Sequence, residues 1–186
     1  MSNLAESLEY FSYRDYKKWD DGTRYELIHG EAYMMSSPSI WHQRMAGSVY
    51  NQLCQFLDSG PCEAFIAPVD VRLFPEEDES DNTVVQPDVF VVCDESKIAD
   101  GKACRGAPDF VVEVVSSSSK MIDKVKKDLY FKSGAKEYWM IGINKVYVYV
   151  LAGSAYTETI YEIKLSHAAE IPVQALPGCT IKIKSE

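Results

Sequence analysis

The sequence predicts one α/β domain in which a central mixed β-sheet is flanked by helices. Residues 36–57 and 118–133 are amphipathic segments. Short apolar runs of the kind that form buried strands lie between these two segments and after the second one. The 46% apolar and 25% charged content is ordinary for a globular protein. Because 186 residues suffice for one hydrophobic core, we expect a single domain over residues 1–186.

The N-terminal region predicts a short helix and then a hairpin. Residues 1–24 are rich in aromatic side chains, contain Ser12 as a possible helix cap, and end at a turn signal. Residues 25–35 are typical of two short strands that turn at His29 and Gly30. We expect residues 1–24 to be an addition to the core.

Residues 36–57 predict the first long helix. Serines at its start are candidate caps, and Pro38 suits the first turn. Apolar residues then recur at helical spacing and give the helix one buried face; they are Met45, Val49, Leu53 and Phe56.

Strand candidates and a second helix follow this helix. We expect strands over residues 64–74, 88–93 and 110–115, and a helix over residues 118–133 that stops at Gly134. Four further strands are expected over residues 137–143, 145–151, 156–165 and 180–183. The part from residue 156 to residue 186 is interpreted as a C-terminal addition to the core.

Two carboxylates on neighbouring strand candidates are the strongest indication of a function. Asp88 begins one strand, and Glu113 lies between pairs of valines in the next. A carboxylate inside an apolar strand is costly unless a cation or a metal compensates its charge. If the strands are adjacent, both side chains can bind one Mg²⁺, which prefers oxygen ligands. For Asp88 a water-exposed place at the strand start is the alternative.

The second helix supplies lysines next to this pair. Ile122, Val125 and Leu129 define its apolar stripe, and Lys126 lies beside that stripe, whereas Lys127 is turned further outward. Helical phase therefore favours Lys126 as the inward lysine, with Lys127 as the second choice. Two carboxylates, a divalent metal and a lysine are the minimal set for metal-assisted phosphodiester hydrolysis.

Two further residues are supporting candidates. His42 falls on the apolar face of the first helix, where a hydrogen-bonded core histidine is commoner than a catalyst. Glu26 lies on a strand candidate and either supports the metal ligands or is paired with Arg24 or Arg44.

Charge, cysteines and hydropathy exclude several classes of protein. The net charge of −9 argues against tight nonspecific binding of nucleic acid, and the acidic run at residues 76–81 predicts a solvated loop. Five widely spaced cysteines without a Cys-x-x-Cys pair predict neither a disulfide framework nor a zinc site, so a reducing cytoplasm fits best. No segment resembles a membrane span or a secretory signal.

Five sequence blocks together resemble a bacterial family of putative restriction endonucleases that is abundant in cyanobacteria and belongs to the PD-(D/E)xK nuclease superfamily. The blocks are residues 25–31, 37–42, 86–89, 107–114 and 134–139. The resemblance covers roughly residues 10–165. It implies a restriction-endonuclease-like core, dependence on Mg²⁺ with Mn²⁺ as a substitute, and DNA as the substrate.

The resemblance also assigns residues. Asp88 matches the first acidic position and Glu113 the second, but the lysine of the superfamily's Glu-x-Lys triplet is replaced by Val115. Members of this family are similar in that respect, and a helix lysine is thought to take its place. Lys126 and Lys127 both remain candidates for that role.

We therefore expect a Mg²⁺-dependent DNA endonuclease in which Asp88 and Glu113 bind the metal and a helix lysine acts on the water or the phosphate. The alternative is a non-enzymatic interaction module that keeps the fold. The aromatic first segment and the strands after Trp139 are candidates for a homodimer interface, and we expect a homodimer. A hydrolase of small phosphoesters is a third, weaker hypothesis.

Overall fold

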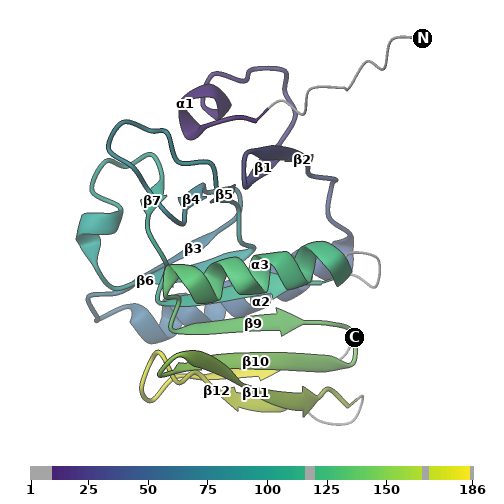
Figure 1. The fold of residues 1–186 in the computed structure, drawn as a ribbon. Helices are drawn as coiled ribbons and strands as arrows, with labels where there is room; N and C mark the ends of the chain where they lie inside the picture. The colour runs from purple at the N-terminus through teal and green to yellow at the C-terminus, as the bar shows by residue number, and fades with distance from the viewer. Residues whose placement is uncertain (1–9, 116–119, 165–167, 185–186) are drawn as a thin grey trace.

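The computed structural model describes residues 10–115, 120–164 and 168–184. Within these ranges the chain forms a six-stranded, a five-stranded and a two-stranded β-sheet. Helices pack on both faces of the largest sheet (Figure 1). The predicted α/β class with a central mixed sheet is confirmed. None of the described helices is long and apolar enough to cross a membrane.

The central sheet has the strand order β11-β10-β9-β8-β6-β3. Strands β8 and β9 are parallel, and the other neighbours are antiparallel. Strands β6, β8 and β9 are almost fully buried, which explains their near-continuous valine and aromatic content. The strand bounds are β3 Glu63–Ile66, β6 Val89–Val92, β8 Phe110–Val114, β9 Glu137–Ile141, β10 Lys145–Ala152 and β11 Ala155–Glu162.

Helix α2 (Ile40–Leu57) covers one face of this sheet, together with the hairpin of β12 (Ala169–Pro172) and β13 (Thr180–Ile183). Ser39 is its N-cap, and the Ser39 side chain accepts a hydrogen bond from the backbone N–H of His42 at 3.2 Å. The helix prediction is thus confirmed, but Phe56 is 44% exposed rather than buried. Strand β12 was not predicted.

Helix α3 (Lys120–Ser133) packs on the opposite face, chiefly through Leu129 and Tyr130. Its predicted start at residue 118 lies outside the described residues. The five-stranded sheet has the order β2-β1-β5-β4-β7 and shares the hydrophobic core of this face. It lies above α3 in Figure 1. Its strands are β1 Tyr25–Ile28, β2 Glu31–Met34, β4 Val71–Arg72, β5 Val84–Val85 and β7 Cys104–Arg105.

The expected hairpin at residues 25–35 is confirmed as β1 and β2. The short helix is confirmed as α1 (Tyr13–Tyr16), capped by Ser12, and a 3₁₀ turn follows β6 at Glu95–Lys97. The single strand expected over residues 64–74 is wrong. It is divided into β3 and β4, because Pro68 has no backbone N–H for a strand ladder.

The expectation that the cysteines form no disulfide is also wrong. Cys62 and Cys93 are disulfide-bonded. The register of β3 and β6 pairs Glu63 with Val92, so the two cysteines fall opposite each other at the next position, with Cα atoms 3.9 Å apart. They are 31 residues apart in sequence, and spacing alone therefore did not indicate the pair.

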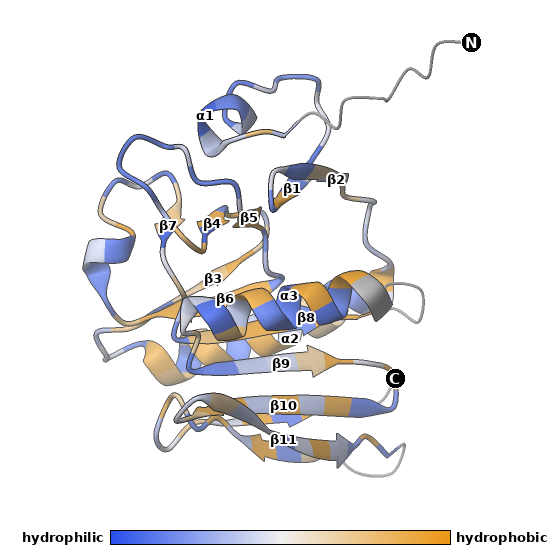
Figure 2. Ribbon diagram, in the orientation of Figure 1, coloured by the Kyte–Doolittle hydropathy of each residue, from blue (hydrophilic) through white to orange (hydrophobic). Residues whose placement is uncertain are grey.

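The acidic loop between β4 and β5 is hydrophilic (Figure 2), and its residues are mostly exposed, as expected, except at its end. Asp81 is buried and forms an ion pair with the buried side chain of Arg72, whose guanidinium also lies 4.2 Å above the Tyr13 ring. Asp70, two residues before Arg72 in the sequence, accepts hydrogen bonds from Tyr16 and Gln86.

Replacing Arg72 by methionine should lower the free energy of unfolding by about 3 kcal/mol, because Asp81 is left buried without its cation. Urea denaturation measures the change. The control is Arg14→Met, which removes an exposed pair with Asp78 and should cost less than about 1 kcal/mol. Equal losses in the two variants would contradict the assigned importance of the buried pair.

Candidate active site

The sheet register brings the two predicted carboxylates together. Val89 pairs with Val112 across β6 and β8, and continuing this antiparallel register places Asp88 opposite Glu113. Side chains alternate between the faces of a sheet, so Glu113 lies with Val111 on the face that carries α3. Asp88 directly precedes β6 and contacts His42 of α2. The two strands are adjacent, as expected from the sequence, and both carboxylates lie at the end of this strand pair.

Glu113 is buried and has two partners on α3. The Nζ atom of Lys126 lies 2.6 Å from Oε1, and the hydroxyl of Tyr130 donates to the same oxygen at 2.9 Å. Lys126 and Tyr130 are one helical turn apart and share a helix face. Burial raises the pKa of Glu113 above its ordinary value, and the charge of Lys126 opposes that rise.

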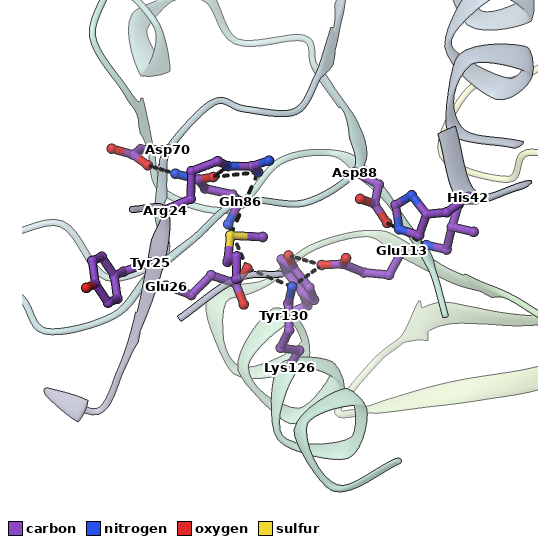
Figure 3. Close-up of polar contacts among 12 residues, drawn as sticks. Arg24, Tyr25, Glu26, His42, Asp70, Gln86, Asp88, Glu113, Lys126 and Tyr130 are labelled. Carbon is purple, nitrogen blue, oxygen red and sulfur yellow. Dashed lines mark hydrogen bonds and ion pairs between the residues drawn. The ribbon is translucent and has the colours of Figure 1, made fainter. Parts of the chain in front are cut away.

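Lys126 joins three elements of the fold. Its Nζ atom also lies 2.8 Å from Oε1 of Glu26 on β1, so one ammonium bridges β1, α3 and β8 (Figure 3). Burial alone would lower the pKa of Lys126, but Glu113 and Glu26 together raise it, which keeps the lysine charged. The sequence suggested Arg24 or Arg44 as the partner of Glu26, but the structure pairs Glu26 with Lys126.

Lys127 lies elsewhere. Its Nζ atom is 4.8 Å from the centre of the Tyr149 ring, on the side of α3 that faces β10. Among the described residues it makes no ion pair with Asp88 or Glu113. Helical phase therefore placed Lys126 correctly, and the structure does not bring Lys127 into the site.

Asp88 is held by α2 and β8. Its Oδ2 atom accepts a hydrogen bond from the backbone N–H of Val114 at 2.7 Å and lies 3.1 Å from Nε2 of His42. The side chain is 14% exposed, so a fully solvated Asp88 is excluded. The hydrogen bond to Asp88 raises the pKa of His42 above its ordinary value, although burial opposes this.

His42 should make stability depend on pH in the metal-free protein. Its folded-state pKa is raised, so its stabilising effect is complete below the unfolded pKa and is lost as the pH rises through the folded value. With EDTA present, the loss of unfolding free energy caused by His42→Gln should be larger at about pH 5.5 than at about pH 9. A pH-independent difference in urea denaturation would contradict this.

These residues line one open cleft of about 730 Å³. The residues that line it come from the start of α2 and the segment before it, from the β1–β2 hairpin, and from α3. Within the cleft, the predicted residues Glu26, His42, Asp88, Glu113 and Lys126 all contribute lining atoms. The cleft can therefore admit a ligand to both carboxylates.

The donor chemistry of this cleft fits a hard divalent cation. Among the described residues, no group of three or more His, Cys, Asp or Glu side chains surrounds a common metal position. Mg²⁺ needs no such cage, because it binds through one or two carboxylates and keeps several waters. Both contacts of Glu113 with α3 use Oε1, so neither of them involves Oε2. Asp88 and Glu113 are thus the residues that could hold the ion.

Three residues of the site were not predicted as site residues. Tyr130 follows Lys126 at the i, i+4 spacing of one helix face, and this spacing was the available signal. Gln86 directly precedes Pro87 and Asp88, and its backbone N–H donates to Glu26 at 2.9 Å. Arg24 was considered only as a partner of Glu26.

Comparisons with known proteins agree on one group. The family model Uma2, described as "Putative restriction endonuclease", matches residues 13–184. No curated protein matches the chain. Among solved structures, "a putative nuclease belonging to DUF820" from Anabaena variabilis ATCC 29413 matches with a TM-score of 0.66 and 18% identity, over 89% of this chain and 90% of that chain. At this identity the match shows a shared fold.

Proposed function

Because the chain belongs to the Uma2 family, whose description is "Putative restriction endonuclease", we propose that it is a metal-dependent endonuclease that hydrolyses phosphodiester bonds of DNA. The restriction-endonuclease-like fold, which it shares with a nuclease-named structure, agrees with this proposal. The observation that carries it is the Asp88–Glu113 pair in an open cleft, with the charged end of Lys126 beside Glu113.

Asp88 and Glu113 would hold one divalent cation, Mg²⁺ by preference and Mn²⁺ as a substitute. When bound, such a cation supplies Lewis-acid polarisation of the scissile phosphate and activates water for attack. His42 and the backbone N–H of Val114 fix the orientation of the Asp88 carboxylate. Tyr130 does the same for Glu113.

Lys126 supplies the positive charge that acts on the phosphate. Its ammonium is held by two carboxylates on different elements, so it needs little rearrangement to stabilise negative charge that develops during attack. Glu26 has the supporting role of holding this lysine in the cleft. The helix thus provides the lysine that Val115 cannot provide.

Supercoiled plasmid and linear DNA, incubated with Mg²⁺ or Mn²⁺, test this function. The wild-type protein should nick or cut both substrates, whereas Asp88→Ala and Glu113→Ala should not. Equal cleavage by all three proteins would exclude this site. No cleavage by the wild type with either ion, and no metal-dependent thermal shift, would favour the non-enzymatic interaction module.

A further inference from the structure

Arg24 lines the same cleft, but its charge is matched differently from that of the other cleft cations. Its Nε and Nη2 atoms donate to the side-chain oxygen of Gln86 at 3.1 and 2.8 Å, and Nη2 lies 3.8 Å from the sulfur of Met35. Both acceptors are uncharged. Among the described residues no carboxylate lies within ion-pair distance of Arg24, whereas Lys126 contacts two.

Arg72, a buried arginine elsewhere in this protein, differs from Arg24 in that a carboxylate matches its charge. The guanidinium of Arg72 is buried against the carboxylate of Asp81, which neutralises it. This is the usual arrangement for an arginine with a purely structural role, because an unmatched charge is costly to desolvate. Arg24 retains its full positive charge at the wall of an open cleft, and an anion there would gain from it.

The guanidinium is also held in a fixed orientation. The buried amide of Gln86 donates from Nε2 to Asp70 at 2.9 Å and to the hydroxyl of Tyr16 at 3.1 Å, which leaves its oxygen for Arg24. Tyr16 in turn donates to Asp70 at 2.9 Å. This chain of hydrogen bonds positions Arg24 without neutralising it by direct contact.

The place of Arg24 on the hairpin relates it to the carboxylate pair. Its backbone oxygen accepts a hydrogen bond from Met35, so the pairing of β1 with β2 extends to Arg24. Arg24 and Glu26 are two residues apart on this extended strand, which puts both side chains on one face, roughly 7 Å apart along it. Glu26 binds Lys126, and Lys126 binds Glu113. Arg24 therefore lies beside the proposed reaction centre and outside it.

We propose that Arg24 binds a backbone phosphate of the substrate strand next to the phosphate that is cleaved. The planar fork of a guanidinium matches the oxygens of a phosphate better than a lysine does. A protein with a net charge of −9 needs such a local cation to hold a polyanion. This inference rests on the proposed function and adds the residue that positions the DNA strand.

The test is equilibrium binding of a fluorescent DNA duplex, measured by anisotropy at several KCl concentrations. Ca²⁺ replaces Mg²⁺, and a gel verifies that the duplex stays intact. Arg24→Met should raise the Kd about tenfold and lower the slope of log Kd against log salt by about one, the value for one lost phosphate contact. Arg24→Lys should keep most of the slope and lose part of the affinity.

The matched control is Arg105→Met, which also removes one arginine charge but lies outside the cleft and pairs with exposed Glu77. It should change neither the Kd nor the slope. Thermal unfolding shows whether each variant is folded. If Arg24→Met is not folded, the Kd of Arg24→Lys tests the role of Arg24. If the wild type binds the duplex, two results would overturn the role of Arg24 and leave the proposed function intact. One is a salt slope in Arg24→Met that equals that of the wild type, and the other is a Kd in Arg24→Lys that equals that of the wild type. Absence of DNA binding by the wild type would contradict the proposed function itself.

Discussion

Replacing Lys126 by methionine is expected to reduce DNA cleavage by about 10²–10³-fold, the typical effect of removing one group that stabilises transition-state charge. The same change should lower the free energy of unfolding by about 3–5 kcal/mol. The reason is that Glu26 and Glu113 then remain buried without the ammonium that both contact. Plasmid cleavage rates and urea denaturation measure the two effects.

Two comparisons separate the catalytic effect from the structural one. Lys127→Met removes a neighbouring lysine that contacts the Tyr149 ring instead of the carboxylates, and should leave cleavage nearly unchanged. Adding Glu26→Gln to Lys126→Met removes one of the unpaired charges, so it should restore part of the stability but none of the cleavage. Normal cleavage by Lys126→Met, or an equal loss in Lys127→Met, would contradict the role given to Lys126.

Replacing Glu113 by glutamine should lower cleavage by at least about 10³-fold, which corresponds to several kcal/mol of lost transition-state stabilisation. The stability should change far less than in Lys126→Met. Burial already raises the pKa of Glu113, so the fold tolerates a neutral side chain there, and Lys126 retains its contact with Glu26. The expected combination is an intact fold, lost metal binding and lost cleavage.

Calorimetric titration with Mn²⁺ and thermal unfolding measure this combination. The control is Glu162→Gln, which removes an exposed carboxylate paired with Lys145 and should alter neither metal binding nor cleavage. Unchanged Mn²⁺ affinity in Glu113→Gln would exclude this carboxylate as a metal ligand. A loss of affinity in both variants would show that the effect is one of general charge.

The elements with strong local signals were predictable from the sequence. Helix α2 follows from its cap at Ser39 and an apolar face at helical spacing, and both signals are local. The two-residue strands β4, β5 and β7 were not predictable, since two residues show no periodicity and their pairing is set by distant segments. For the same reason the five-stranded sheet was not predicted from the sequence.

The site divides in the same way. Helical phase favoured Lys126, and the valines on both sides of Glu113 marked it as a carboxylate inside an apolar strand, because each signal depends on neighbouring residues only. The pairing of Lys126 with Glu26 spans 100 residues and depends on how β1 packs against α3. Sequence spacing contains no such information. The same limit applies to the Cys62–Cys93 disulfide.

A crystal structure of the protein soaked with Mn²⁺, with the ion located by its anomalous signal, tests the central claim most directly. The expected result is one ion bonded to carboxylate oxygens of both Asp88 and Glu113 at about 2.2 Å, with waters completing its coordination. Lys126 should remain beside Glu113, and Lys127 should remain against the Tyr149 ring. An ion bound only elsewhere, or none at all in the cleft, would contradict the proposed two-carboxylate nuclease site.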